Sequence, residues 1–203
     1  MRHYIFQKFM LFCLTLATLG SCGLDLQEDY DYNASTSDPH LNMTAWDFFQ
    51  SRQDLFSEFT QAIEYAEMKD YYTQQENLYT YLALSNAAMQ TFRENNFPGA
   101  TSITECDKEA VKKLLLYHIV NGEYSSYGQL QVEPMFVLTL LPGEEGLMTM
   151  CVRKNPWQAA VGQITINDTG SNSKSPVRYA KTSNLLPVNG VIHVFDNYCY
   201  YKK

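Results

Sequence analysis

Apolar and polar positions divide the chain into a helical first half and a second half rich in short strands. From Leu55 to Ala66, apolar residues recur with helical spacing, which predicts an amphipathic helix ending near Met68. Capping patterns at Thr44–Asp47 and Ser51–Asp54 predict the starts of a short helix and of this longer one. Met68–Asn77 is polar and predicts a loop.

One buried strand and two further helices are predicted between residues 78 and 120. Leu78–Leu84 is a nearly continuous apolar run, which is typical of a strand buried on both faces. Ser85-Asn86 then predicts the cap of a short helix, Ala87–Phe92. From Asp107, apolar residues keep helical spacing to about Val120, where a helix stop signal follows.

Short strands separated by turn residues are predicted in the rest of the chain. They are Met135–Leu141, Leu147–Arg153, Gln163–Asn167, Val177–Lys181, Val191–Phe195 and Tyr198–Tyr201. The first two form a hairpin, and Asp168–Ser175 is expected to be an exposed loop. Asn189-Gly190 is a turn signal, and the strand after it has apolar residues on both faces, so it should close a sheet begun earlier in the chain. Helices first and strands later predict an α+β domain over residues 43–203.

The first residues resemble the signal peptide of a bacterial lipoprotein. Arg2 and Lys8 precede an apolar run of eleven residues, which is too short to span a bilayer. The run ends in Leu19-Gly20-Ser21-Cys22, which is similar to a lipobox. We therefore expect cleavage after residue 21 and a lipid anchor on Cys22, which would place the protein at the outer membrane, facing the cell surface.

Residues 22–42 predict an acidic, flexible tether between the anchor and the domain. The stretch from Cys22 to Ser51 holds six acids and no Lys or Arg, and no apolar periodicity is visible before Pro39. Acids soon after a lipidated Cys resemble the surface-export signal of Bacteroidota lipoproteins. Asp29, Asp31 and Asn33 mimic the start of a calcium loop, but Ala34 replaces the required Gly and no Glu follows, so we reject that site.

Charge excludes two classes of partner. The 203 residues carry a net charge of −7, with 15 Lys and Arg against 22 Asp and Glu. Binding to nucleic acid depends on basic side chains that neutralise phosphates, and docking on anionic lipid depends on a basic surface. We therefore expect no nucleic-acid partner, and membrane contact only through the lipid anchor. The chain is also rich in aromatic residues, with 15 Tyr and 11 Phe.

Three segments resemble, in order, the signature segments of the fasciclin domain. They are Leu78–Phe92, Leu114–Val120 with its Tyr-His pair, and Asn189–Asp196. The resemblance implies a sandwich-like wedge of β-strands flanked by several short helices, used for adhesion or extracellular binding and not for catalysis. The first segment departs from the family pattern, because Leu84 stands in place of Pro and Met89 in place of Phe, with Ala87 in place of an acid.

The residues that carry this resemblance are interpreted as structural. They are Ser85, Asn86, Tyr117, His118, Asn189, Gly190, His193 and Asp196. The resemblance implies that Asn86 caps the short helix and that Tyr117 and His118 pack centrally. The alternative is an adhesion determinant at Tyr117-His118 on the surface. His118 shares an apolar stripe with Val111 and Leu114, which favours a buried, hydrogen-bonded side chain.

The chain shows no pattern typical of catalysis, of a metal site or of a cofactor. It has no nucleophile elbow, no zinc-protease motif, no phosphate-binding Gly loop and no Cys-x-x-Cys. His118 and His193 could be neighbours in space, but no closely spaced Cys, His or carboxylate accompanies them. Cys106, Cys151 and Cys199 are interpreted as buried thiols, with a Cys151–Cys199 disulfide as the alternative.

The sequence leaves more than one kind of ligand open. A fasciclin-like adhesion domain would bind an extracellular protein or a polymer. An accessory glycan-binding lipoprotein of a polysaccharide-uptake system would instead need exposed aromatic platforms. Trp157, Tyr124 and Tyr127 are the candidates for such contacts, because they lie in predicted loops. A hydrolase is the third hypothesis, and it requires a cleft with convergent polar groups.

Overall fold

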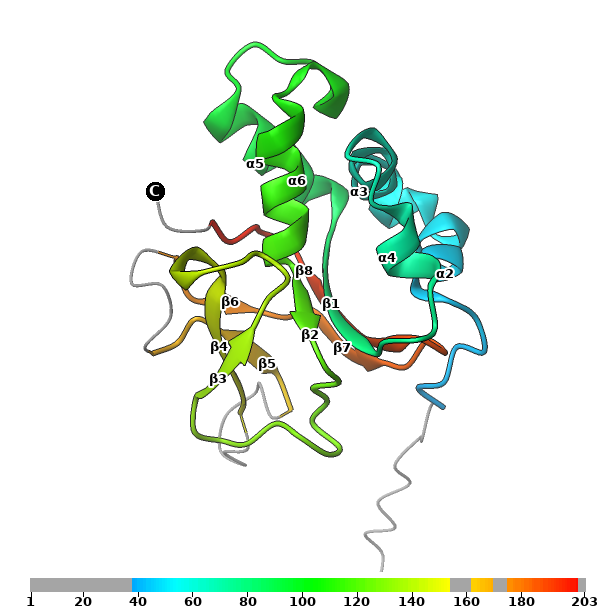
Figure 1. Ribbon diagram of the computed structural model, residues 1–203, viewed down its shortest axis with the longest axis vertical. Coiled ribbons are helices and arrows are strands. Elements are labelled where there is room, and N and C mark those ends of the chain that lie inside the picture. Colours follow the sequence, from blue (N-terminus) through cyan, green and yellow to red (C-terminus); the bar gives the residue numbers. More distant parts are fainter. Residues whose placement is uncertain (1–37, 154–161, 170–174, 201–203) are drawn as a thin grey trace, which may run out of the picture. The chain divides into compact units, whose positions relative to one another are not determined.

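The computed structural model describes residues 38–153, 162–169 and 175–200 (Figure 1). By its contacts, the chain from Pro39 onward forms one compact unit. The predicted signal peptide, Cys22, most of the predicted tether and Trp157 lie outside the described residues. In the described end of the predicted tether, Leu41 N donates to Leu186 O at 3.0 Å and Leu186 N donates to Pro39 O at 2.8 Å. The chain therefore pairs with the domain from Pro39.

The first sheet has the strand order β2-β1-β8-β7. It consists of β1 (Tyr79–Leu84), β2 (Ile119–Asn121), β7 (Thr182–Leu185) and β8 (Gly190–Phe195). The two central strands, β1 and β8, run parallel and are buried at every position. This confirms the prediction that the last strand closes a sheet begun earlier and is buried on both faces.

The second sheet has the order β3-β4-β5-β6 and is antiparallel throughout. It consists of β3 (Met135–Leu138), β4 (Leu147–Val152), β5 (Ile164–Ile166) and β6 (Arg178–Tyr179). The predicted hairpin is thus present, with a short 3₁₀ helix, η2 (Glu144–Gly146), in its turn. A single bridge from Val120 to Thr139 joins this sheet to β2.

Five α-helices and a second short 3₁₀ helix, η1 (Ile103–Glu105), complete the described residues. The α-helices are α2 (Ala45–Ser51), α3 (Gln53–Tyr65), α4 (Lys69–Thr73), α5 (Asn86–Asn96) and α6 (Lys108–Tyr117). In Figure 1, α2, α3 and α4 gather on one side of the first sheet, and α6 leads directly into β2. The structure therefore confirms a mixed α+β fold with two sheets and several short helices.

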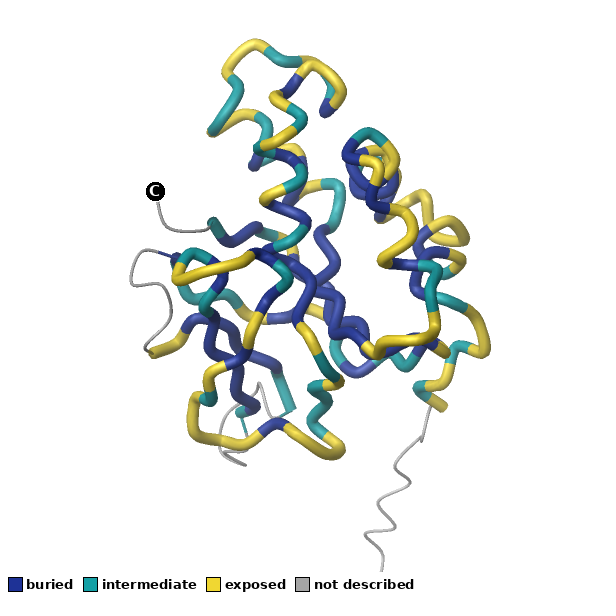
Figure 2. Tube along the Cα trace, in the orientation of Figure 1, coloured by how far each residue is buried: buried dark blue, intermediate teal, exposed yellow. Residues whose placement is uncertain are grey.

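The side of the domain that carries the helices has an aromatic core. Phe49, Phe56, Phe59 and Tyr72 are fully buried and contact one another, with ring centroids 5.1 to 6.5 Å apart. Tyr72 stacks on Tyr81 of β1 at 5.2 Å. In Figure 2, the trace of β1 and parts of the traces of α2, α3 and α4 are coloured as buried. Much of the unusual aromatic content is therefore used for packing helices onto β1.

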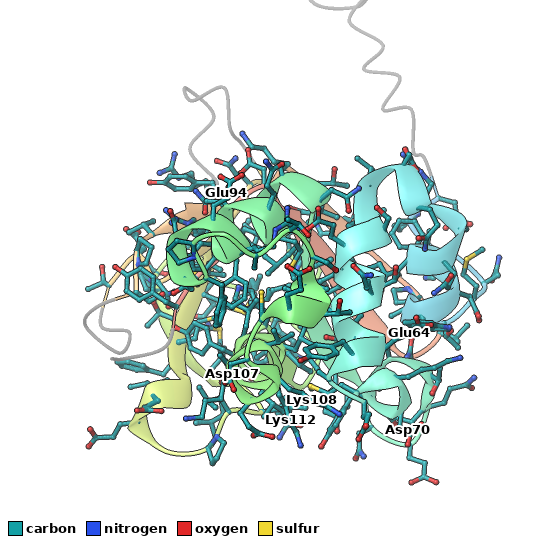
Figure 3. All side chains as sticks on the ribbon, turned by 90° about the horizontal axis from the view of Figure 1, so that it is seen from above. Glu64, Asp70, Glu94, Asp107, Lys108 and Lys112 are labelled. Atoms are coloured by element: carbon teal, nitrogen blue, oxygen red, sulfur yellow. The ribbon has the colours of Figure 1, made fainter. Side chains whose placement is uncertain are left out.

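Two polar contacts join the end of α3 and the turn after it to the segment that begins α6. Tyr65 Oη donates to Cys106 O at 2.9 Å, and Lys108 Nζ lies 2.6 Å from Glu67 Oε1. Lys108 and Lys112 lie close together at this end of α6 (Figure 3). The ion pair is exposed, so it contributes little stability, and the tyrosine hydrogen bond is the firmer link.

Several predicted element boundaries were wrong. The loop predicted at Met68–Asn77 contains α4, because a helix of one turn with one buried residue leaves no periodic pattern. Helix α6 ends at Tyr117, and the apolar residues after His118 form β2. Arg52, not Ser51, is the N-cap residue of α3. Strand β7 was not predicted, and Tyr198–Tyr200 is not a strand.

Candidate functional site

Asn189 is a fully buried connector between three elements. Its Oδ1 accepts a hydrogen bond from Ala45 N at the start of α2, at 2.8 Å. Its Nδ2 donates to Tyr72 O in α4 at 2.8 Å and to Tyr81 Oη in β1 at 3.0 Å. One amide therefore satisfies buried groups from two helices and a strand, which an apolar or a charged side chain could not do.

Gly190 permits the close approach of β8 to β1. Its φ is +148°, and a Cβ built at this position would lie 1.9 Å from Tyr79 O. Gly190 is also the residue opposite Tyr79 in the parallel register. Both the backbone conformation and the space require glycine here, so the Asn-Gly pair sets the alignment of the central strands.

His193 links the middle of β8 to the neighbouring strand β7 and to the loop at Tyr124. Its Nδ1 accepts from Asn184 N at 3.1 Å, and its Nε2 donates to Tyr124 O at 2.8 Å, which fixes a neutral ring with the proton on Nε2. Burial lowers the pKa of His193 to about 4. Asp196, at the end of the same segment, is exposed and lies 3.1 Å from Lys181 Nζ.

Ser85 and Asn86 have different tasks. Ser85 is the N-cap of α5, and its hydroxyl accepts from Ala88 N at 3.4 Å. Asn86 does not cap this helix, which corrects the expectation carried over from the family. Its Oδ1 accepts from Glu58 N at 2.9 Å and its Nδ2 donates to Asp54 O at 3.2 Å. In an uninterrupted helix, Glu58 N would donate to Asp54 O, four residues earlier. The Asn86 side-chain amide therefore bonds to both members of this backbone pair of α3.

Tyr117 and His118 lie at the junction of the two sheets and are buried. The Tyr117 hydroxyl is 3.4 Å from both Leu147 O and Asn167 Oδ1, in the second sheet and the residue after β5. His118 Nδ1 donates to Leu114 O at 2.8 Å, and its Nε2 accepts from Cys199 N at 3.2 Å. Burial raises the pKa of Tyr117 to about 12 and lowers that of His118 to about 4.

His118 and His193 both lie next to Leu82 of β1, but their side chains do not form a common site. His118 O accepts from Leu82 N, and His193 is the residue opposite Leu82 in β8. Their side chains bind different segments. Within the described residues, no group of three or more His, Cys, Asp or Glu side chains is arranged to hold a metal ion.

The three described cysteines are free thiols and are buried. The Cys199 thiol accepts from Asn167 Nδ2 at 3.3 Å, next to the Tyr117 hydroxyl. Burial raises the pKa of Cys199 to about 11, so this sulfur stays protonated and packs as a small polar group. The disulfide considered between Cys151 and Cys199 is absent.

The predicted ligand-binding tyrosines differ in exposure. Tyr124 is half-buried; its N–H donates to Thr80 Oγ1 at 2.8 Å and its carbonyl accepts from His193, so its backbone is part of the fold. Tyr127 is 69% exposed. The two residues are therefore not equivalent candidates, and only Tyr127 presents its ring to solvent. Trp157, the third candidate, lies outside the described residues.

A cluster of exposed apolar side chains lies close to Tyr127 along the chain. The four most exposed large apolar residues in the described part of the chain are Tyr127, Val132, Phe136 and Leu138, at 51 to 69%. We call these four residues the 127–138 surface. In Figure 2, most of the loop before β3 is coloured as exposed, whereas β3 itself includes the buried residue Val137. The sequence pattern predicted β3 but did not single out Phe136 or Leu138, because a short apolar run looks the same whether its outer face is covered or open.

The domain has two four-stranded sheets, of which the first has a central parallel pair and the second is antiparallel throughout. Short helices flank the sheets, and the buried motifs join these elements. This arrangement defines an α+β domain of the fasciclin type. The family model of the fasciclin domain matches residues 54–199, and the chain belongs to this family.

Among solved structures, the chain is similar to a FAS1 domain pair from the insect cell adhesion molecule fasciclin I. The identity is 13%, the TM-score is 0.55, and the match covers 77% of this chain and 50% of the other, so the chain spans about half of that structure's length. This likeness concerns the fold alone. No curated protein sequence matches the chain.

Proposed function

We propose that this protein is a non-enzymatic, lipid-anchored protein of the cell envelope that binds an extracellular protein or polymer through the 127–138 surface. Membership of the fasciclin family supports a role in adhesion or binding. The observation that carries the proposal is the concentration of exposed apolar side chains between Tyr127 and Leu138. Phe136 and Leu138 are two residues apart on β3, so their side chains share one face of the strand. Neighbouring exposed apolar side chains favour an interaction site, because contact with water is unfavourable for them.

The buried family motifs are not the proposed ligand site. Asn189, His118 and His193 are at most 1% exposed, and their polar atoms bind groups of the fold. A ligand could reach them only by displacing these partners. We therefore place ligand recognition on the loop and strand between Tyr127 and Leu138.

The surface is tested by changing its apolar side chains to serine. Beads coated with the protein are passed over surfaces coated with cell-envelope polysaccharides and extracellular proteins, and retention is counted. We expect Phe136→Ser with Leu138→Ser to reduce retention on the bound surface about tenfold or more. Leu55→Ser is the matched control, because Leu55 is also exposed but lies on α3, away from this surface. Equal retention of all variants would exclude the 127–138 surface.

A glycan ligand is the second candidate function, and the exposed ring of Tyr127 favours it. Sugars stack on aromatic faces, so Tyr127→Phe should keep binding on a glycan array, whereas Tyr127→Ala should lose it. A blank array with the unmodified protein would exclude this function and leave a protein ligand.

The lipid anchor is tested at Cys22. No helix of the described residues is long and apolar enough to cross a membrane. We expect Cys22→Ala to move the protein from the membrane fraction to the soluble fraction, because the acyl chains would have no attachment site. Cys13→Ala is the control, since this residue lies within the predicted signal peptide and should not affect anchoring. Continued membrane retention of Cys22→Ala would contradict the lipoprotein proposal.

A further inference from the structure

A second group of exposed apolar residues lies at the end of the first sheet where β1 and β8 begin. The group consists of Met43, Tyr71, Leu78 and Val188, which are 37 to 47% exposed. We call these four residues the 43–188 surface. They belong to four separate segments: the residues before α2, helix α4, the residue before β1 and the turn before β8.

Backbone hydrogen bonds place three of these segments side by side. Val188 N donates to Met43 O at 2.9 Å, so the turn before β8 contacts the segment before α2. Tyr79 N donates to Asn189 O at 3.4 Å. Leu78 directly precedes Tyr79, and Val188 directly precedes Asn189. Leu78 and Val188 therefore lie at the starts of two adjacent strands.

Tyr71 is bound to the same end of the sheet. Its carbonyl accepts a hydrogen bond from Tyr81 Oη at 3.0 Å, and Asn189 Nδ2 donates to that hydroxyl at 3.0 Å and to Tyr72 O at 2.8 Å. The buried Asn189 amide thus joins the segments that carry the four exposed residues. Exposed apolar side chains gathered in this way favour an interaction surface.

The chain enters the domain beside the 43–188 surface. His40 pairs with Leu186 in a parallel bridge, and Leu41 N donates to Leu186 O at 3.0 Å. In Figure 1, the first described residues lie beside the turn between β7 and β8, at the end of the sheet where β1 begins. Residues 23–37 separate the expected anchor on Cys22 from the described chain. A flexible linker of about fifteen residues spans roughly 20 Å, so the anchor would keep this end of the domain near the bilayer.

We propose that the 43–188 surface contacts the lipid bilayer, with its apolar side chains among the lipid headgroups, and thereby orients the domain on the membrane. This inference rests on the lipid anchor of the proposed function. The anchor raises the local concentration of the domain at the bilayer, so a small apolar contact is sufficient. Tyr71 suits such a position, because tyrosine is enriched at membrane interfaces, where its ring is buried and its hydroxyl is hydrated.

Charge favours a neutral lipid surface. Asp70 directly precedes Tyr71, and Glu76 lies two residues before Leu78, whereas Lys69 is the base in this part of the chain. These neighbours do not form a basic cluster, so they would not attract anionic headgroups. The net charge predicts the same, and the proposed contact is apolar. It should therefore form on zwitterionic phosphatidylcholine and should not weaken as salt is added.

The test measures whether this end of the domain reaches the bilayer. The full-length lipidated protein is reconstituted into phosphatidylcholine vesicles with a nitroxide spin label on Gln75→Cys. Gln75 is exposed and lies three residues before Leu78, and the described native cysteines are buried, which protects them from labelling. Oxygen concentrates in the bilayer and a nickel chelate stays in water, so the ratio of their collision rates with the label reports contact with lipid.

Two pairs of substitutions are compared in this labelled protein. Leu78→Ser with Val188→Ser removes the most exposed part of the 43–188 surface. Leu55→Ser with Tyr179→Ser is the matched control, because both residues are 40% exposed but lie on α3 and β6. We expect the first pair to lower the oxygen-to-nickel ratio about threefold or more and the control pair to leave it unchanged.

Retention on the ligand-coated surface shows that the variants are folded, because the 127–138 surface is intact in both pairs. Met43→Ser with Tyr71→Ser provides a second variant if Leu78→Ser with Val188→Ser fails to fold. The same fall in the oxygen-to-nickel ratio is expected for it.

Three results would overturn the inference. A ratio typical of water that is equal in all the vesicle-bound proteins would exclude bilayer contact and leave the lipid anchor standing. Failure of the unmodified protein to stay on the vesicles would exclude the anchor and, with it, this inference. Protection of the label from oxygen and nickel alike, reversed by Leu78→Ser with Val188→Ser, would assign the surface to a protein partner.

Discussion

At the scale of single residues, Gly190 shows how one position determines the pairing of two strands. Its φ of +148° and the 1.9 Å between a built Cβ and Tyr79 O are separate obstacles to any side chain. We predict that Gly190→Ala lowers the free energy of unfolding by more than about 3 kcal/mol, because the backbone of β8 must move away from β1.

Gly99→Ala separates the effect of a positive φ from the effect of the steric contact with a neighbouring strand. Gly99 also has a positive φ, +97°, but no atom lies within 4 Å of a built Cβ, so its loss should be only about 1 kcal/mol. Urea unfolding followed by circular dichroism measures both variants. If both lose the same stability, the contact with Tyr79 is not the cause.

The buried histidines predict a pH dependence of stability. His118 and His193 have pKa values of about 4 in the folded protein because burial disfavours their charged forms, against about 6.5 when unfolded. Between these values the unfolded chain binds more protons, so stability is complete above pH 6.5 and is lost as the pH falls towards 4. The loss approaches about 3 kcal/mol for each histidine.

Urea unfolding at pH 7, 5.5 and 4 measures this loss, and NMR titration of the two imidazole rings assigns it. A pKa near 6.5 for either ring in the folded protein would remove that histidine from the explanation.

At the scale of elements, the Ser85-Asn86 pair joins two helices that are distant in sequence. Ser85 caps α5, whereas Asn86 bonds to the backbone of α3. Substitutions at the two positions should therefore change amide exchange at different residues. We predict that Asn86→Ala speeds amide exchange at Glu58, because the acceptor of this N–H is lost. Ser85→Ala should instead speed exchange at Ala88 and lower stability by about 1 kcal/mol. Equal effects on both amides in either variant would contradict separate roles.

The elements that the sequence predicted correctly carry either a long periodic pattern or a position that few residues can occupy. Helix α3 has repeated apolar spacing. The turn signal Asn189-Gly190 predicts the start of β8, and the structure requires glycine at position 190. Both signals lie within a few residues of the element that they specify. Local patterns therefore placed the central strands and the main helices.

The elements that the sequence missed depend on distant partners. β2 continues the apolar pattern of α6, and only its pairing with β1 makes it a strand. The side chain of Asn86 was assigned to its own helix, whereas its partners lie in α3, 28 and 32 residues away.

At the scale of the whole molecule, Tyr117 and His118 connect the two sheets. His118 contacts β1 through its carbonyl and the C-terminal segment through its ring, while the Tyr117 hydroxyl faces Leu147 and Asn167 in the region of the second sheet. The family's Tyr-His pair is therefore placed where it can couple the sheets mechanically. This location also explains why a surface role for the pair would disrupt the fold.

The last prediction tests that coupling. Tyr117→Phe removes the hydroxyl and keeps the ring, so it should weaken the attachment of the second sheet while the aromatic packing remains. A buried hydrogen bond contributes about 1 kcal/mol, which corresponds to roughly fivefold faster amide exchange. We expect this at Met148 and Thr165, with the amides of β1 and β8 unchanged. Tyr65→Phe is the matched control, since its hydroxyl bonds Cys106 O outside both sheets. If exchange rises equally in both sheets, they unfold as one unit and Tyr117 stabilises the whole domain without coupling its parts.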